Sequence, residues 1–190
     1  MVLKERIYPL GDKELVLRSA TEADAEMLQR YIKTVTGETR FLMCEPDEMN
    51  ITAEDELEFI KEHLDSPDEM LIVGFIVEDV DGERREIYVG NCSFERVGGS
   101  RRYAHRAGIG IALYQKYTGL GIGKLMLRAL LEEIQSQGYE QAELTVVGGN
   151  ERALHLYESY GFKEYGRLRN ANKFDDGTYA DDILMVKTFD

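Results

Sequence analysis

Residues 111–124 read Ile-Ala-Leu-Tyr-Gln-Lys-Tyr-Thr-Gly-Leu-Gly-Ile-Gly-Lys, an apolar run that ends in three glycines two positions apart. Apolar residues at helical spacing follow, up to Gly138, where a C-terminal cap is expected. The stretch therefore predicts a strand, a glycine-rich turn and a long helix. Such a turn leaves the first helical N–H groups unpaired at the positive end of the helix dipole, which predicts an anion site. Glycines there remove the Cβ atoms that would keep a phosphate away from the backbone.

Two familiar phosphate-binding motifs do not fit these glycines. A Walker loop needs Gly-x4-Gly-Lys-Ser/Thr, but Leu125 follows Lys124, and Thr118 stands where the first glycine belongs. A dinucleotide fingerprint needs GxGxxG and an acidic residue about 20 residues later, whereas the spacing here is GxGxG. Neither motif therefore identifies the phosphate ligand.

Composition limits the class of protein. The chain has 190 residues, of which 43% are hydrophobic and 31% charged, so residues 1–190 are expected to form a single globular domain. No apolar run approaches the roughly 18 residues of a membrane span, and the first residues lack the apolar core of a signal peptide, so we expect a cytoplasmic protein with no membrane partner. The net charge of −13 argues against a nucleic-acid partner. Cys44 and Cys92 are expected to be free thiols.

The order of patterns along the chain predicts the fold class. Hairpins of antiparallel strands run into a strand-helix-strand unit, so we expect an α/β fold with a mixed, mostly antiparallel sheet of six to seven strands and about four helices. Helices are expected after Thr21 up to Gly37, after the capping box at Thr52, over 122–137 and over 151–160. Strands are expected over 14–19, 70–79, 86–94, 104–115, 141–147, 162–168 and 179–188.

Two blocks resemble one known family. Thr118-Gly-Leu-Gly-Ile-Gly123 resembles the pyrophosphate-binding loop, Gln/Arg-x-x-Gly-x-Gly/Ala, of the GNAT superfamily of acetyl-CoA-dependent N-acetyltransferases, although Thr118 stands where Gln or Arg is usual. The segment from Asn150 to Phe162 resembles the family's Asn-x-x-Ala-x-x-x-Tyr-x-x-x-Gly-Phe block, again one helix and one strand after the loop. The resemblance covers about 70–188 and implies a GNAT-like sheet with acetyl-CoA as cosubstrate and no metal.

The resemblance also implies roles for individual residues. In the family the strand before the loop splays and offers backbone groups to the pantetheine arm, while the loop holds the pyrophosphate. Tyr157 matches the general acid that protonates the leaving thiolate, and a phenol of pKa about 10 suits a thiol of pKa about 8.5. The residues implied to bind the cofactor are Ile111, Ala112, Leu113, Thr118, Gly119, Leu120, Gly121, Ile122, Gly123, Lys124, Asn150 and Ala153.

The general base is not identified by the resemblance. Some family members carry a glutamate on the strand that here begins near His105, and others carry one on the next strand, where this chain has Thr145. Neither position holds a carboxylate here. His105 and Glu143 are candidates that would act through a water chain, although a hydrogen-bonded structural imidazole is the preferred interpretation of His105.

The loop over 38–51 is the expected acceptor site, because in the family this loop lies across the acyl end of the cofactor. Its carboxylates Glu45, Asp47 and Glu48 are expected to attract a cationic amine, while Phe41 and Met43 cover its carbon skeleton. A solvated acidic loop in an acidic protein is the alternative.

Two functions follow from these observations. The first is an N-acetyltransferase that moves an acetyl group from acetyl-CoA to a primary amine of a small molecule or protein by direct attack. The second is a catalytically weak acyl-CoA-binding regulatory module, which the missing base would explain. The sequence does not identify the acceptor or the general base, and it is compatible with a monomer or a homodimer.

Overall fold

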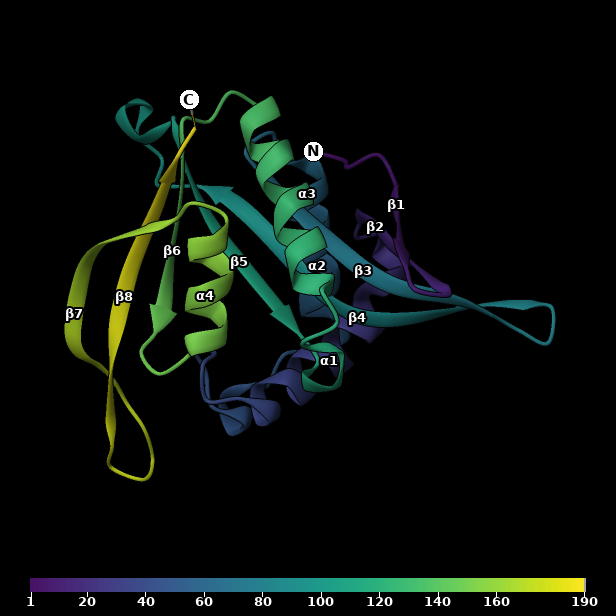
Figure 1. The fold of residues 1–190 in the computed structure, drawn as a ribbon, viewed down its shortest axis with the longest axis horizontal. Coiled ribbons are helices and arrows are strands. Elements are labelled where there is room, and N and C mark those ends of the chain that lie inside the picture. The colour runs from purple at the N-terminus through teal and green to yellow at the C-terminus, as the bar shows by residue number, and fades with distance from the viewer. Residues whose placement is uncertain (190) are drawn as a thin grey trace.

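An eight-stranded mixed sheet organises the computed structural model, which describes residues 1–189 (Figure 1). The strand order is β1-β2-β3-β4-β5-β6-β8-β7, and every neighbouring pair is antiparallel except β5 and β6. The sheet is thus mixed and mostly antiparallel, as predicted. The strands are β1 (Arg6–Leu10), β2 (Lys13–Ser19), β3 (Glu69–Val80), β4 (Glu83–Arg96), β5 (Arg106–Leu113), β6 (Gln141–Val147), β7 (Lys163–Lys173) and β8 (Tyr179–Thr188).

Helices cover both faces of this sheet. Alternate residues of β3 show the division, because Met70 and Ile72 join the core under α3 (Ile122–Ser136), whereas Leu71 and Val73 join the core under α1 (Ala25–Glu38) and α2 (Ala53–Asp65). The fourth helix, α4 (Glu151–Ser159), lies on the same face as α3 (Figure 1). No helix in residues 1–189 is long and apolar enough to cross a membrane.

The sheet contains a fork between β5 and β6. These parallel strands pair over only three positions, from Arg106 with Gln141 to Gly108 with Glu143. Beyond Gly108, β5 continues beside β4 as far as Leu113, while β6 pairs with β8 on its other side. The segment of β5 from Ile109 to Leu113 therefore has a neighbouring strand on one side only.

Local sequence signals set several of the boundaries. The Asp81-Gly82 turn between β3 and β4 has both residues at positive φ, 56° and 83°, which is the type I′ geometry that suits a tight hairpin. Thr52 caps α2 by accepting from the Asp55 N–H at 3.2 Å, while the Asp55 carboxylate accepts from the Thr52 N–H at 2.8 Å. The predicted capping box is confirmed.

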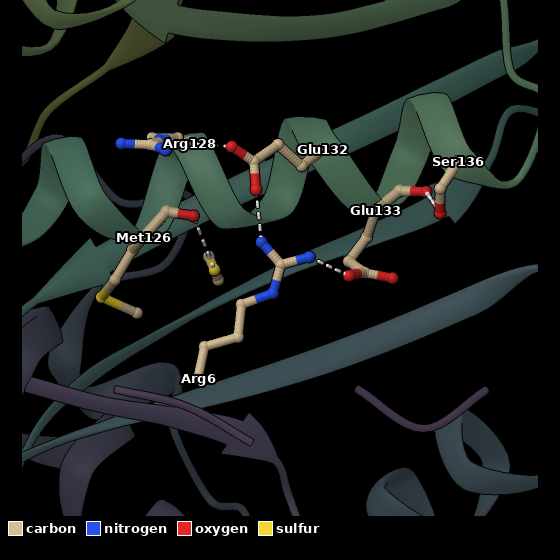
Figure 2. A network of polar contacts seen from close by, with 7 residues as sticks. Arg6, Met126, Arg128, Glu132, Glu133 and Ser136 are labelled. Atoms are coloured by element: carbon tan, nitrogen blue, oxygen red, sulfur yellow. Dashed lines mark hydrogen bonds and ion pairs between the residues drawn. The ribbon is translucent and has the colours of Figure 1, made fainter. Parts of the chain in front are cut away.

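The sheet has eight strands rather than the expected six to seven, because β1 was not predicted from the sequence. Pro9 stands in β1, and proline argues against a strand except at a sheet edge, which is where β1 lies. Arg6 ties this edge to α3 through ion pairs with Glu132 and Glu133 (Figure 2). The contact joins segments far apart in the chain, so local patterns carry no trace of it.

Candidate active site

The glycine turn ends as a row of free backbone donors. Gly119 and Gly121 adopt left-handed φ values of 80° and 84°, which L side chains rarely adopt. The N–H of Thr118 bonds to Gln115 O at 3.1 Å and that of Lys124 bonds to Gly121 O at 3.1 Å. The five N–H groups over 119–123 are different. None of them donates to a backbone carbonyl in the turns, loops and caps of residues 1–189. Alternating conformations with free N–H groups at a helix start form an anion-binding nest.

A guanidinium lies beside this nest. Arg152, in the first turn of α4, donates to Thr118 Oγ1, and the same hydroxyl donates to Gln115 O at 2.7 Å. Thr118 therefore positions a positive charge that comes from another helix. Arg152 was not predicted as a site residue, although it lies only two residues after the helix cap Asn150.

The fork aims backbone groups of β5 into open space. The Tyr114 N–H bonds to Val89 O and the Val97 N–H bonds to Arg106 O, both at 3.0 Å, and the register between these two bonds is unbroken. Antiparallel bonds alternate, so the even-numbered residues of β5 turn their N–H and C=O groups toward β4. Ile111 and Leu113 turn theirs into the fork. The backbone of Ala112 faces β4, and only its side chain lines the cleft.

A cleft of about 1190 Å³ passes through the fork and joins the two faces of the sheet. Its wall on the α3 and α4 face includes Ile111, Leu113, Thr118, Gly123, Leu144, Val146, Asn150, Arg152, Ala153, Leu156 and Tyr157. Its wall on the other face includes Glu38, Phe41, Met43, Ser93, Glu95, Gly108, Gly110, Glu143, Thr145 and Tyr165. An elongated ligand held at the nest can therefore reach a second ligand on the opposite face.

Tyr157 is the buried phenol of the cleft wall. It is 7% exposed, and its ring meets that of Phe162 edge to face at 5.6 Å. Burial raises the pKa of Tyr157 above its usual value, with a smaller contribution from Cys92, so the hydroxyl keeps its proton at neutral pH. The neighbouring wall residue Asn150 caps α4, because its Oδ1 accepts from the Ala153 N–H at 3.2 Å.

Three residues stand side by side across the sheet where the fork opens. Gly108 of β5 pairs with Glu95 of β4 and with Glu143 of β6, and all three line the cleft. Arg106 holds the Glu143 carboxylate in two bonds, from Nε to Oε1 at 2.8 Å and from Nη2 to Oε2 at 2.7 Å. His105 is not in the cleft wall, and its carbonyl accepts the N–H groups that begin β6. Glu95 was not predicted from the sequence, because the strand register that places it opposite Gly108 cannot be derived from local patterns.

The acidic loop does not lie as expected. Phe41 and Met43 line the cleft, but Glu45, Asp47 and Glu48 are not in its wall. Glu48 Oε2 instead accepts from the Glu45 N–H at 2.8 Å, which closes a capping box around a short 3-10 helix. The three carboxylates therefore do not line the cleft as expected, because the Glu48 carboxylate is engaged in this cap and Asp47 is exposed to solvent.

The loop is fastened to the opposite edge of the sheet. The Arg40 guanidinium lies 3.6 Å from the centre of the Phe174 ring, and its Nη2 donates to Thr178 Oγ1 at 2.8 Å. Phe174 and Thr178 belong to the turn between β7 and β8, so this turn supports the loop that covers the cleft.

Comparisons with known proteins agree with this geometry. The model of the acetyltransferase (GNAT) family matches residues 37–162. A [ribosomal protein bS18]-alanine N-acetyltransferase of Escherichia coli (strain K12) is 36% identical over 76 residues, which cover 40% of this chain and 51% of that protein. The chain thus spans about half the length of the curated relatives it matches.

Two solved structures share the fold. An acetyltransferase of the GNAT family from Streptococcus pneumoniae has a TM-score of 0.81 at 26% identity, covering 92% of this chain and 99% of that one. A ribosomal L7/L12 alpha-N-protein acetyltransferase in complex with coenzyme A has a TM-score of 0.73 at 18% identity, covering 97% and 99%. The second likeness concerns the fold alone.

Proposed function

The chain belongs to the acetyltransferase (GNAT) family, and we propose that it is an N-acetyltransferase that moves an acetyl group from acetyl-CoA to a primary amine of a small molecule or protein. One observation carries the proposal: the cleft runs from an anion nest at the start of α3, through the fork, to the opposite face of the sheet. A cosubstrate with a pyrophosphate at one end and a thioester at the other fits that path.

The residues of the chain divide the work as follows. The N–H groups over 119–123, with Arg152 beside them, hold the pyrophosphate. The backbone groups of Ile111 and Leu113 bind the pantetheine arm in place of a neighbouring strand. Tyr157, buried and protonated, gives its proton to the sulfur as the thioester breaks. Acetyl-CoA supplies the activated acyl group.

Burial acts both on the Tyr157 phenol and on the thiolate that it protonates. Its raised pKa makes the free phenol a weaker acid than usual. The leaving thiolate would lie against the same buried wall of the cleft, and desolvation raises the pKa of a thiol as well. Proton transfer between two groups desolvated together therefore remains favourable enough for catalysis.

The acceptor side supports an enzyme over a binding module. A regulatory module needs no ionisable groups there, yet Glu38, Glu95 and Glu143 line the cleft on that face. Because a relative named above acetylates an alanine of a ribosomal protein, a peptide amine is a natural first probe. The single domain over 1–190, the cytoplasmic location, the absence of a nucleic-acid partner, and the monomeric or homodimeric state stay predictions.

The experiment is an acetyl-transfer assay with three amines: a peptide that begins with alanine, spermidine and glucosamine. Thiol release from acetyl-CoA gives the rate, and mass spectrometry shows the added acetyl group on the amine. We expect transfer to at least one amine at a rate well above the release seen without an amine. Tight binding of acetyl-CoA with no transfer to any of the three would instead favour the regulatory module.

A further inference from the structure

The strip Glu95-Gly108-Glu143 lies across three adjacent strands at the point where β5 and β6 separate. Gly108 presents no side chain between the two carboxylates. A Cβ built on Gly108 would stand 3.9 Å from Glu95 Cγ and 3.7 Å from Val97 Cγ2, so both neighbours lean over the same face. Glu95 and Glu143 flank Gly108 on the neighbouring strands, so the slot over Gly108 has a carboxylate-bearing residue on each side.

The two carboxylates are not equivalent. Glu143 is held in a bidentate pair by Arg106, which neutralises its charge and fixes its position. Glu95 is in no ion pair within residues 1–189, and it is exposed to the cleft rather than buried. With Arg106 included, the strip carries a net charge of −1, which is matched by a single ammonium group.

The other carboxylates of the cleft are committed or remote. Glu38 accepts the Gln115 N–H at 2.6 Å, which occupies its carboxylate at the base of the loop. Glu151 lies in the first turn of α4, on the side of the nest. Elimination therefore leaves Glu95 as the free carboxylate beside the opening through which the fork joins the two faces.

We propose that the slot over Gly108 receives the amine and that Glu95 is the general base, an inference that rests on the proposed N-acetyltransferase function. Glu95 takes one proton from the ammonium and passes it to water, leaving a neutral amine. The amine nitrogen bonds to the thioester carbon, the C–S bond breaks, Tyr157 protonates the sulfur, and the second nitrogen proton leaves through Glu95. Arg106 is a positioning residue that keeps Glu143 as the second wall.

The slot also predicts the class of acceptor. Two carboxylates flank it, and one of them is free, so an acceptor that carries its own carboxylate next to the amine is repelled. The favoured acceptors are therefore primary amines without a neighbouring carboxylate, such as a peptide amino terminus or a polyamine. Free α-amino acids are poor acceptors.

The test removes the carboxylate of Glu95 or shortens the side chain that carries it. Glu95→Gln should lower kcat/KM for the best of the three panel amines by roughly 10²- to 10⁴-fold, with the Kd for acetyl-CoA within twofold of wild type by calorimetry. Glu83→Gln, on the distant end of the same strand, is the matched control and should change neither value by more than twofold. Glu95→Asp keeps the carboxylate on a shorter side chain and should retain at least tenfold more of the rate than Glu95→Gln.

Binding gives a readout that does not depend on turnover. Gly108→Val fills the slot in a strand that accepts β-branched residues, and it should weaken binding of the chosen amine to the CoA-loaded protein at least tenfold. Alaninamide should be acetylated at least tenfold faster than alanine when each rate is divided by the fraction of the amine that is neutral. If the wild type is active and Glu95→Gln has a kcat/KM within threefold of it, the role of Glu95 is overturned but the proposed function stands. If the wild type acetylates none of the panel amines, both the proposed function and the role of Glu95 are overturned.

Discussion

Substitution of Gly121 by alanine tests whether the nest binds the pyrophosphate. Gly121 has a φ of 84° and nothing within 4 Å of the place where a Cβ would stand. The added methyl therefore meets no protein atom, and its only costs are backbone strain and its position in front of the free N–H groups. Alanine is preferable to a β-branched residue, which is a true outlier at this φ.

The two costs have different sizes and appear in different assays. A left-handed L residue costs about 1–2 kcal/mol, which for a chain of this length lowers Tm by roughly 2–8 °C. The protein stays folded, since domains have about 5–15 kcal/mol of stability. Loss of even one charge-assisted hydrogen bond to phosphate costs about 1.5–3 kcal/mol, which raises the Kd for coenzyme A roughly tenfold or more.

Gly138 supplies the control, because it caps the other end of α3 with the same φ of 84° and the same open surroundings. Gly138→Ala should lower Tm as Gly121→Ala does, while its Kd for coenzyme A stays at the wild-type value. Calorimetry and thermal unfolding on both variants separate strain from binding. Equal coenzyme A affinities in the two variants would refute the assignment of the nest.

Three further outcomes are expected. Tyr157→Phe should lower kcat roughly 10²- to 10⁴-fold with little change in KM for acetyl-CoA, and near-normal kcat in steady-state kinetics would dismiss Tyr157 as the acid. Arg152→Ala should raise the Kd for coenzyme A roughly tenfold and flatten its salt dependence; an unchanged titration at low and high salt would contradict the role of Arg152. Burial alone would raise the pKa of Asp24, but bonds from Arg18 and Thr21 outweigh it and lower that pKa. This contribution to stability is present above the ordinary carboxyl pKa and is lost as the pH falls through the lowered pKa of Asp24. Asp24→Asn should therefore lower the free energy of unfolding by roughly 1.5–3 kcal/mol near neutral pH and by progressively less in acid. Thermal unfolding across pH measures the difference.

Features that depend on neighbouring residues could be predicted from the sequence. The left-handed turn at Asp81-Gly82, the capping box at Thr52 and the glycine nest before α3 follow from local backbone chemistry, which is written in consecutive residues. The order of helices and strands followed as well, because apolar periodicity shows which face of each element is buried. These signals were enough to predict the mixed sheet and the glycine turn at the start of α3.

Which side chains meet at the acceptor face could not be predicted from local patterns, because these side chains come from separate strands. Strand β1 was missed because a proline is tolerated only at a sheet edge, and an edge is defined by what lies beside it. Glu95 and Gly108 come from different strands, and the register that pairs them is set by packing over the whole hairpin. The three carboxylates of the loop after α1 were expected at the acceptor site, but none of them lines the cleft, and the Glu48 carboxylate caps a short 3-10 helix instead. Long-range register and burial are properties of the assembled sheet, so no local pattern contains them.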